Sequence, residues 1–504
     1  MIELDGASLT LDDLLAIAND FAPVSIAASA RTRVGAARAV VDEFAARDTP
    51  TYGINTGFGS FADVKIPASE LSELQVNLLR SHAAGVGEPL PVPVVRATSA
   101  LRANVLAKGF SGIRLDTLDL LVALLNRRVH PVVPSRGSVG ASGDLAPLAH
   151  LALVLIGEGE AWNGSAREPG AAALARAGLT PVALAPKEGL ALINGTQPST
   201  ALLGFAVAGA ERLARAADIA AALSIDGLQG STTPFDPRIH AARGFAGQRA
   251  SAENLDALLA ASGINAAHAN CGRVQDAYSM RCAPQVHGTA RDACRYAHEV
   301  FRIEANAATD NPMVFADTRE IVSGGNFHGA PVAVAADLLC IALAQLATIS
   351  ERRSDRLVNP GLSGLPAFLT PHGGLQSGLM MAQVTAAAVT SELKTLAHPA
   401  SVDTIPTSGN KEDHVSMSMS AALKAARAVE LAQYVVAIEL LCASQAIDLL
   451  APLETSAPLA RVHACIRAHV ATLTGDRPPS TDIARISELI ASGELERACA
   501  MKVN

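Results

Sequence analysis

The chain has 504 residues, a formal net charge of −8 and a pI near 5.9, a balance that disfavours nucleic acid and anionic membranes as partners. Hydrophobic residues make up 49% of the chain but aromatic residues only 3%, so the apolar content is mostly Ala, Leu and Val. Such a mixture favours long, closely packed helices and argues against a string of independent modules. The composition therefore predicts a mainly α fold.

The mean hydropathy of +0.27 is high for a monomer, and we interpret it as surface buried between subunits. Apolar stretches such as Val332 to Ala347 carry Asp337 and are shorter than a membrane span needs, so no transmembrane segment is predicted. The N-terminus, Met1 to Asp5, lacks a signal-peptide pattern. Seven cysteines without any Cys-x-x-Cys spacing indicate reduced thiols in a cytoplasm.

The first elements are two predicted amphipathic helices, Thr10 to Asn19 and Ala27 to Arg47, in which nothing suggests chemistry. A glycine-rich loop, Tyr52 to Gly59, follows them. It has neither the lysine of a Walker loop nor a Gly-x-Gly-x-x-Gly pattern, so a phosphate cradle is not expected. On this pattern alone Tyr52 is either a packed loop aromatic or a catalytic phenol.

The next predicted helix runs from Leu71 to Ser81 and ends in the run Ser81 to Gly87. His82 stands at the end of this helix. A single histidine there is more often a capping or surface residue than a catalytic one.

The chain is organised around the segment Arg136 to His150, which reads Arg-Gly-Ser-Val-Gly-Ala-Ser-Gly-Asp-Leu-Ala-Pro-Leu-Ala-His. Its three glycines allow a tight loop. Asp144 is predicted to be an N-cap, since the sequence turns apolar after it and Pro147 falls in a first helical turn. A helix is therefore expected to begin here.

The tripeptide Ala141-Ser142-Gly143 has the residue types for a self-made electrophile. If the Gly143 nitrogen attacks the Ala141 carbonyl carbon and Ser142 loses its hydroxyl as water, the backbone closes into a methylidene-imidazolone ring. Small Ala141 permits the approach, Ser142 supplies the methylidene carbon, and Gly143 offers an uncrowded nitrogen. The N-terminus of the following helix would add partial positive charge beside the ring.

Two other interpretations of this segment are a plain Gly/Ser-rich connector and the nucleophile of a hydrolase. The Gly-x-Ser-x-Gly pattern of such a nucleophile fails, because Asp144 occupies the last glycine position.

The run Gly137 to His150 closely resembles the signature of the aromatic amino acid ammonia-lyases, and within them the histidine-specific enzymes. The resemblance extends over nearly the whole chain. It implies elimination of ammonia from L-histidine to give trans-urocanate, with the methylidene-imidazolone formed from Ala141, Ser142 and Gly143 as the only cofactor. It also implies a homotetramer with shared active sites and no metal.

The resemblance assigns roles to the earlier motifs as well. The Tyr52 motif carries a catalytic tyrosine in the family. The pair Ser81-His82 is typical of members that handle imidazole, where phenylalanine enzymes resemble Phe-Leu, although some tyrosine aminomutases also show Ser-His.

The run Ala191 to Gln197 contains an Asn-Gly turn signal at Asn194. The resemblance instead places Asn194 against the prosthetic ring and the substrate amine. A long helix, Ser199 to Leu228, is predicted next, and residues 163 to 187 before it are expected to form a connector.

A second cluster of polar residues is Val274 to Gln285, in which Tyr278 and Arg281 stand three apart and would share one helical face. A guanidinium beside a phenol favours the phenolate, although a surface cation and aromatic pair is the plainer interpretation. The resemblance makes Tyr278 the general base and Arg281 the clamp on the substrate carboxylate, with Gln275 also at the substrate.

Two further motifs match the family, Glu304 to Pro312 and Gly324 to Gly329. The resemblance places Phe327 near the ring, whereas the residues alone would make it a core aromatic.

Three long helices are predicted next: Pro331 to Leu357, Leu375 to Leu396 and Val415 to Leu450. The last is apolar around much of its circumference and needs partners on several sides, which favours an oligomeric bundle. Residues 451 to 504 are predicted to be a helical tail, and its His463 and His469 match no strong metal motif.

Between the last two long helices lies the run Thr407 to Met417, with Glu412 and Asp413 before a helix. Such a pair is ordinarily a first-turn charge that faces the helix dipole. Histidine-specific enzymes resemble this run with Asn-Gln-Glu-Asp-His, whereas phenylalanine and tyrosine enzymes carry Asn-Gln-Asp-Val. Lys411 departs from the usual Gln but leaves Glu412 in register.

The predicted fold is thus mainly α with minor β content, divided into an N-terminal domain of residues 1–198 with the prosthetic-group loop and a long-helix bundle of residues 199–504. Tyr278 is expected to take the β-proton, and the electrophile to activate either the amine or the imidazole. Glu412 and His82 would address the imidazole, and Tyr52 and Asn194 the amine. The rivals are a tyrosine or phenylalanine lyase or aminomutase of the same family, and an inactive relative that serves as a structural or binding oligomer.

Overall fold

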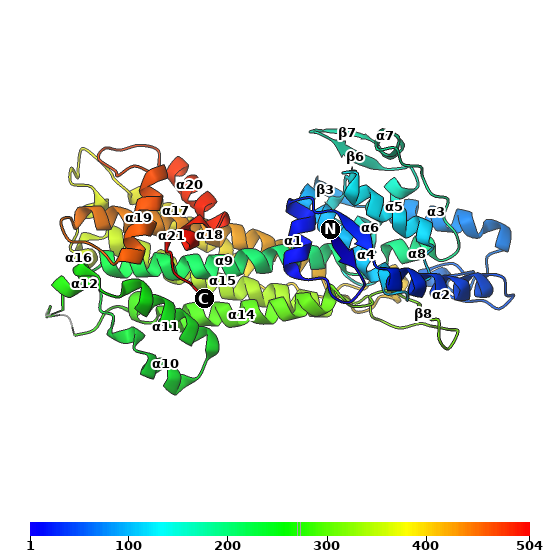
Figure 1. Cartoon of the computed structure of the whole chain (residues 1–504), viewed down its shortest axis with the longest axis horizontal. Coiled ribbons are helices and arrows are strands. Elements are labelled where there is room, and N and C mark those ends of the chain that lie inside the picture. Colours follow the sequence, from blue (N-terminus) through cyan, green and yellow to red (C-terminus); the bar gives the residue numbers. More distant parts are fainter. Residues whose placement is uncertain (270, 273) are drawn as a thin grey trace. The chain divides into compact units, whose positions relative to one another are not determined.

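The structure is a computed structural model that describes residues 1–269, 271–272 and 274–504 (Figure 1). The chain forms two compact units, each assembled from separate segments. Unit 1 comprises Met1–Phe205, His298–Ala336 and Pro399–Leu423, and unit 2 comprises Ala206–Ala297, Asp337–His398 and Lys424–Asn504. The predicted division into two consecutive domains, residues 1–198 and residues 199–504, stays a prediction.

Unit 1 holds many short elements. Its helices and 3₁₀ turns are α1 (Leu11–Asn19), α2 (Ala28–Ala45), η1 (Gly59–Phe61), η2 (Ala68–Glu70), α3 (Leu71–His82), α4 (Val92–Ala107), α5 (Leu115–Asn126), α6 (Leu145–Leu155), α7 (Gly170–Arg176), α8 (Glu188–Ile193) and η5 (Ser408–Asn410). Its strands are β1 (Ile2–Leu4), β2 (Val24–Ile26), β3 (Val86–Pro89), β4 (His130–Pro131), β5 (Pro134–Arg136), β6 (Glu160–Asn163), β7 (Ala166–Pro169), β8 (Met313–Phe315) and β9 (Glu320–Val322).

The strands pair into four small sheets. β1 and β2 are parallel, β3 pairs antiparallel with β5, β4, β6 and β7 form a three-stranded antiparallel sheet, and β8 and β9 form an antiparallel pair. The prediction of a mainly α fold with minor β content is confirmed.

In unit 2 the regular elements of the described residues are all helices or 3₁₀ turns. Its elements are η3 (Thr233–Phe235), α10 (Pro237–Arg243), α11 (Ala246–Leu259), α12 (Gly263–Ala267), α13 (Tyr278–Arg281), α16 (Pro360–Ser363), η4 (Ala367–Leu369), α17 (Met380–Leu396), α19 (Ala457–His469), α20 (Pro479–Ala491) and α21 (Glu494–Ala498). Four of the five unit boundaries fall within long helices, and the fifth follows the end of α17. The four helices are α9 (Gln197–Gly227), α14 (Ala283–Glu304), α15 (Ala330–Val358) and α18 (Ser418–Leu449).

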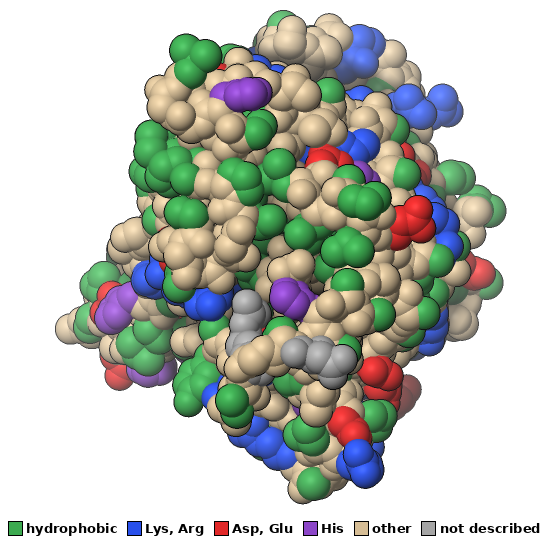
Figure 2. Space-filling view, turned by 90° about the vertical axis from the view of Figure 1, so that its left-hand side faces the viewer, with side chains coloured by type: hydrophobic (Ala, Val, Ile, Leu, Met, Phe, Trp, Pro, Cys, Tyr) green, Lys and Arg blue, Asp and Glu red, His purple; other side chains and the backbone are tan. Residues whose placement is uncertain are grey.

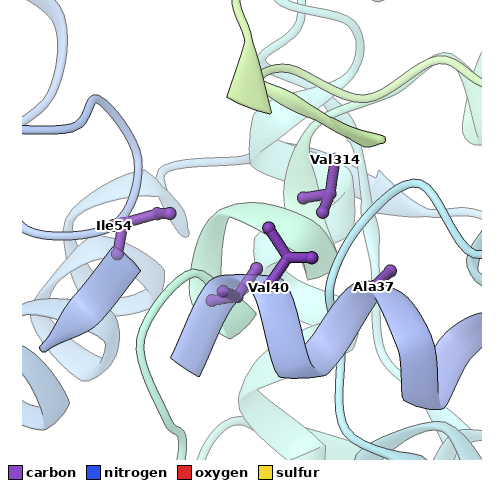
Figure 3. Packing of buried hydrophobic residues seen from close by; sticks show 5 residues of the cluster. Ala37, Val40, Ile54 and Val314 are labelled. Carbon is purple, nitrogen blue, oxygen red and sulfur yellow. The ribbon is translucent and has the colours of Figure 1, made fainter. Parts of the chain in front are cut away.

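The N-terminal helices begin and pack as their sequences predict. Thr10 caps α1 with a capping box, in which its hydroxyl accepts from the Asp13 N–H and the Asp13 carboxylate accepts from the Thr10 N–H. On α2, Ala37 and Val40 face a buried cluster with Ile54 and Val314 (Figure 3). The β8 strand is thereby joined to the N-terminal helices by apolar contacts between residues distant in sequence.

Most predicted helices are present, with shifts at their ends. α9 and α15 agree with the prediction to within two residues. α17 begins at Met380 rather than Leu375, and α18 begins at Ser418 rather than Val415. In both places the apolar pattern runs on through turn or extended backbone, so the pattern overestimates the length of the helix.

Residues 163–187 are more regular than the expected connector. β6 and β7 form a hairpin in which Asn163 pairs with Ala166, and helix α7 follows from Gly170. The tail beyond residue 451 is helical as predicted, in α19, α20 and α21.

Helix α15 corrects one argument from the sequence. At 29 residues, with a window mean hydropathy of 2.1, it is long and apolar enough to cross a membrane, so the length argument is wrong. However, 67% of that window is buried inside the structure, as is usual for the core helix of a globular protein.

Unit 2 also presents apolar side chains on its surface. Figure 2 looks onto the end where α12 and α16 lie in Figure 1 and shows hydrophobic side chains spread over this face. Val274 and Leu375 are 96% and 91% exposed.

Candidate active site

The centre of the site is the loop that carries Ala141, Ser142 and Gly143. Gly143 has a φ of +72°, and a Cβ at this position would lie 2.3 Å from the Gly195 carbonyl oxygen. The Asp144 N–H donates to the same oxygen over 2.8 Å. Only glycine fits at position 143, and the segment at Gly195 forms one wall of the loop.

A second segment holds the loop from another side. The Ser416 hydroxyl donates to the Gly140 carbonyl over 2.8 Å, and the Met417 N–H donates to the Val139 carbonyl over 2.8 Å. These two bonds explain why α18 does not begin at Val415, because the residues before Ser418 are engaged with the loop instead of with a helix.

Asp144 precedes α6 as predicted, but its side chain makes no capping hydrogen bond to that helix. The fully buried carboxylate instead accepts from the Ser138 hydroxyl at 2.7 Å and from the Ser199 N–H at 2.9 Å. Burial raises the pKa of Asp144, against the effect of these two donors. The predicted N-cap position of Asp144 is confirmed, but its carboxylate ties the loop to the first turn of α9 instead of capping α6.

Ser142 lies between two of the predicted site residues. Its hydroxyl donates to Glu412 Oε1 over 2.6 Å, and its carbonyl accepts from Asn194 Nδ2 over 2.8 Å. The Asn194 Oδ1 is buried and has no hydrogen-bond partner in the part of the chain that the structure describes. It is an acceptor available to a bound molecule.

Glu412 is held by hydroxyl groups. Its Oε2 accepts from Thr407 Oγ1 at 2.6 Å and from Ser408 Oγ at 2.8 Å. Burial favours the neutral acid, but the Ser142, Thr407 and Ser408 donors outweigh it and hold the pKa of Glu412 below its ordinary value. Glu412 is therefore a carboxylate at neutral pH. Thr407 and Ser408 were given no role from the sequence, although they stand within the quoted motif.

His82 ends α3 and is partly buried. Its Nδ1 lies 2.9 Å from the Leu78 carbonyl oxygen, a contact that assigns the ring proton to Nδ1 and leaves Nε2 as an acceptor. Burial lowers the pKa of His82, against the raising effects of the Leu78 carbonyl and of Glu412. The ring is thus neutral at pH 7.

Tyr52 lies edge-on to Phe58, with ring centroids 6.2 Å apart. Burial raises the pKa of its phenol, and the negative charge of Glu412 adds to this, whereas a hydrogen bond from the Gly59 backbone opposes it. Tyr52 is accordingly a neutral phenol that can donate a proton or a hydrogen bond.

These groups line one cavity of about 430 Å³ within unit 1, a size typical of small-molecule sites. The predicted site residues among its walls are Tyr52, His82, Ala141, Ser142, Asn194, Phe327 and Glu412. Lys411 also lines the cavity, so its departure from the family pattern lies at the site itself.

The sequence did not single out two histidines of this cavity. His328 and His414 stack with ring centroids 5.8 Å apart and an interplanar angle of 7°. His328 lies in the Gly324 to Gly329 motif and His414 in the Thr407 to Met417 motif, which were considered for Phe327 and Glu412. A histidine in each of two motifs that line the cavity is the signal that could have identified them.

The remaining predicted residues, Gln275, Tyr278 and Arg281, belong to unit 2 and are not among the residues that line this cavity. Tyr278 and Arg281 share the single turn of α13, with the guanidinium carbon 4.6 Å from the centre of the phenol ring, as their spacing predicts. Tyr278 is 70% exposed. Gln275 and Arg281 line a separate pocket within unit 2.

A buried ionic network lies beneath α13. Arg353 Nη1 donates to the Ser279 carbonyl over 3.1 Å, while its Nε and Nη2 bond Glu439 at 2.5 and 2.9 Å. His287 is 3.3 Å from Arg353 and 2.7 Å from Asp218. The bond from Arg353 holds the Ser279 carbonyl, between Tyr278 and Arg281, and Glu439 and His287 hold Arg353.

Within residues 1–269, 271–272 and 274–504, no group of three His, Cys, Asp or Glu side chains could hold a metal ion. All seven cysteines are free thiols.

Comparison with known proteins identifies the family. The model of the aromatic amino acid lyases matches residues 9–468. A histidine ammonia-lyase of Anaeromyxobacter sp. (strain K) is 58% identical over 502 residues, covering 98% of this chain and 99% of that protein. The crystal structure of the histidine ammonia-lyase of Trypanosoma cruzi superposes with a TM-score of 0.92 at 45% identity, covering 99% of this chain and 95% of the other.

A tyrosine aminomutase from Streptomyces globisporus is also similar, with a TM-score of 0.95, 37% identity and full coverage of both chains. The chain belongs to the aromatic amino acid lyase family, as its central motif predicts. The fold alone does not separate lyases from aminomutases, so the choice of substrate depends on the site residues.

Proposed function

We propose that this protein eliminates ammonia from L-histidine to give trans-urocanate. The observation that carries the proposal is the position of Glu412, a carboxylate 2.6 Å from the Ser142 hydroxyl in the same cavity as a neutral His82. A carboxylate and an imidazole can hydrogen-bond the two ring nitrogens of a histidine substrate, which a phenyl ring does not offer. The similar histidine ammonia-lyases support this choice.

The loop geometry fits a methylidene-imidazolone formed from Ala141, Ser142 and Gly143. Formation joins the Gly143 nitrogen to the Ala141 carbonyl carbon with loss of one water, and Ser142 then loses its hydroxyl and Cα hydrogen as a second water. The contact of Gly143 with Gly195 leaves no room for a side chain, so the nitrogen stays uncrowded. Once formed, the group supplies an electrophile that activates the substrate for loss of a weakly acidic β-hydrogen.

The unit 1 residues then have distinct tasks. Glu412 accepts a hydrogen bond from one imidazole N–H of the substrate, and its negative charge favours the protonated ring. In that form the second ring nitrogen also carries a proton, which His82 Nε2 accepts. Asn194 Oδ1 accepts from the substrate amine. Tyr52, a neutral phenol in the same cavity, would donate to the leaving ammonia.

We propose that Tyr278, Arg281 and Gln275 reach the cavity of another subunit in a homotetramer. Tyr278 is largely exposed on its own chain, and unit 2 carries exposed apolar side chains such as Val274. Tyr278 would take the β-proton, and the forked guanidinium of Arg281 would hold the substrate carboxylate. This arrangement also accounts for the high mean hydropathy of +0.27. A cytoplasmic location completes the proposal.

Complementation tests the shared site. Ser142→Ala and Tyr278→Phe are each expected to be inactive alone, whereas co-assembled mixtures should recover about a quarter of wild-type activity, because that share of sites takes both intact groups from different subunits. The measurement is urocanate formation by mixed, co-expressed oligomers. Mixtures as inactive as the parents, or an active monomer by light scattering, would contradict the sharing.

Dialysed, chelator-treated protein is expected to keep full activity on L-histidine, because the proposed electrophile comes from the chain itself. Activity before and after treatment is the measurement. A loss that zinc or pyridoxal phosphate reverses would refute this expectation.

The direct test of the function is the absorbance of purified protein mixed with L-histidine, followed for the appearance of urocanate. L-Tyrosine and L-phenylalanine are the parallel substrates. Faster turnover of tyrosine than of histidine would establish the rival lyase or aminomutase instead.

A further inference from the structure

A buried arginine, Arg102 on α4, lies behind the turn that carries Asn194. Its Nη1 donates to the Asn194 carbonyl and to Gln197 Oε1, both over 2.8 Å, and its Nη2 donates to the Ala191 carbonyl. The side chain is fully buried. Helix α8 ends here, so the guanidinium satisfies backbone carbonyls that the end of a helix leaves without partners.

The turn that Arg102 holds is the one that presses on the electrophile loop. Asn194 donates to the Ser142 carbonyl, and the Gly195 carbonyl accepts from the Asp144 N–H. Gly195 lies so close to the guanidinium that a Cβ there would be 2.5 Å from Arg102 Nη1. The turn is thus packed between Arg102 on one side and residues 142–144 on the other.

We propose that Arg102 is a positioning residue, which holds the Asn194-Gly195 turn against the Ala141-Ser142-Gly143 loop and thereby serves both ring formation and the placement of Asn194. This inference rests on the proposed function. Arg102 acts through the turn, since it is not among the residues that line the cavity.

The forked shape of the guanidinium is essential to this task. One nitrogen bonds Asn194 and Gln197 while the other bonds Ala191, so a single rigid plane fixes three acceptors. Gln197 is itself held, because its Nε2 donates to Thr309 Oγ1 over 2.8 Å. An ammonium group is a compact point charge and cannot hold the same three acceptors in one plane.

The same helix offers a matched control. Arg96 is also buried, at 2% exposure, and donates to the backbone carbonyls of Ile17 and Leu125. Burial lowers the pKa of both arginines to about 10, so both are charged at neutral pH. Neither partner of Arg96 belongs to the site. Arg96→Lys therefore has the general cost of changing a buried arginine without touching the Asn194 turn.

The experiment compares Arg102→Lys with Arg96→Lys in the full-length protein. Intact mass measures the share of chains that have lost two waters, thermal unfolding measures stability, and steady-state rates on L-histidine give kcat and KM per cyclised chain. We expect Arg102→Lys to lower the cyclised share severalfold and kcat per cyclised chain by about tenfold, in the range of a lost electrostatic or orienting contact. Arg96→Lys should keep both at the wild-type level at a similar loss of Tm.

A milder variant keeps the test decisive if Arg102→Lys does not fold. Gln197→Leu removes one anchor of the guanidinium and is expected to shift both readouts in the same direction by a smaller factor. The inference is overturned if Arg102→Lys, or Gln197→Leu in its place, matches Arg96→Lys in cyclised share and kcat. A wild-type protein with no mass deficit would instead refute the self-made electrophile, and the positioning role with it.

Discussion

Ser142→Ala is expected to abolish the mass deficit of two waters and to lower turnover of L-histidine on the order of a thousandfold or more. The substitution removes the hydroxyl whose loss creates the methylidene carbon, so the electrophile cannot form. The fold should survive, since Ser142 is a loop residue whose side chain bonds only Glu412 in the described structure. Intact-mass measurement and urocanate formation are the two readouts.

Ser135→Ala is the control for this substitution. Ser135 lies on β5, just before the loop, and is absent from the cavity lining. This variant should show the wild-type mass deficit and activity. An equal deficit in Ser142→Ala, or full activity of that variant, would end the argument for an electrophile made from the chain.

The parts of the site that could be predicted from the sequence are those carried by short continuous motifs. The 137–150 run contains the loop and its glycines. In the structure the Gly195 carbonyl lies so close to Gly143 that no side chain fits there, which explains the glycine. The Tyr278 and Arg281 pair follows from helical spacing alone. In these cases the chemistry and the local geometry are encoded in neighbouring residues.

The parts that could not be predicted depend on contacts between distant segments. Arg102 stands in an apolar helix and its three acceptors lie about ninety residues further on, so no local pattern reveals it. The apolar pattern predicts too early a start for α18 for the same reason, because Ser416 and Met417 bond the loop at residues 139–140 rather than a helix. Apolar periodicity predicts which side chains are buried, but it does not predict which segment of the chain buries them.

The buried carboxylate of Asp144 shows a related limit of prediction from the sequence. Asp144 has the residue type and position of an N-cap, yet its carboxylate bonds Ser138 and Ser199. A capping pattern states that a carboxylate is near a helix start. The choice between the several N–H and O–H donors at that place is made by the tertiary fold.

Glu412→Gln is expected to lower turnover of L-histidine on the order of a hundredfold or more, in the range usual for a positioned electrostatic group. Glutamine has nearly the same size and its amide oxygen can still accept from Thr407 or Ser408, so the loop should remain in place. The lost property is the negative charge toward the imidazole. Leaving a buried partner of the ring unpaired costs about 1 to 3 kcal/mol in binding alone.

The pH dependence has a defined sign. In the uncyclised chain the Ser142, Thr407 and Ser408 hydroxyls hold the pKa of Glu412 below its ordinary value despite burial. Ring formation removes the Ser142 hydroxyl, while Thr407 and Ser408 still donate to Oε2 and favour the carboxylate. Turnover that needs the charge is therefore expected at neutral pH and should fall as the pH drops through the pKa of Glu412 in the cyclised protein. In Glu412→Gln this acid limb should be absent.

The companion variant, His82→Leu, is expected to lower histidine activity and to shift preference toward tyrosine or phenylalanine, because it replaces a ring-nitrogen acceptor by an apolar side chain. Glu430→Gln is the control for removal of a carboxylate, since Glu430 pairs with Arg427 at the surface and its side chain is 50% exposed. Steady-state rates of each variant on the three amino acids are the measurement. If Glu412→Gln turns over histidine as fast as wild type does, or if wild type prefers tyrosine, the assignment to histidine is wrong and the site belongs to an aromatic lyase or aminomutase.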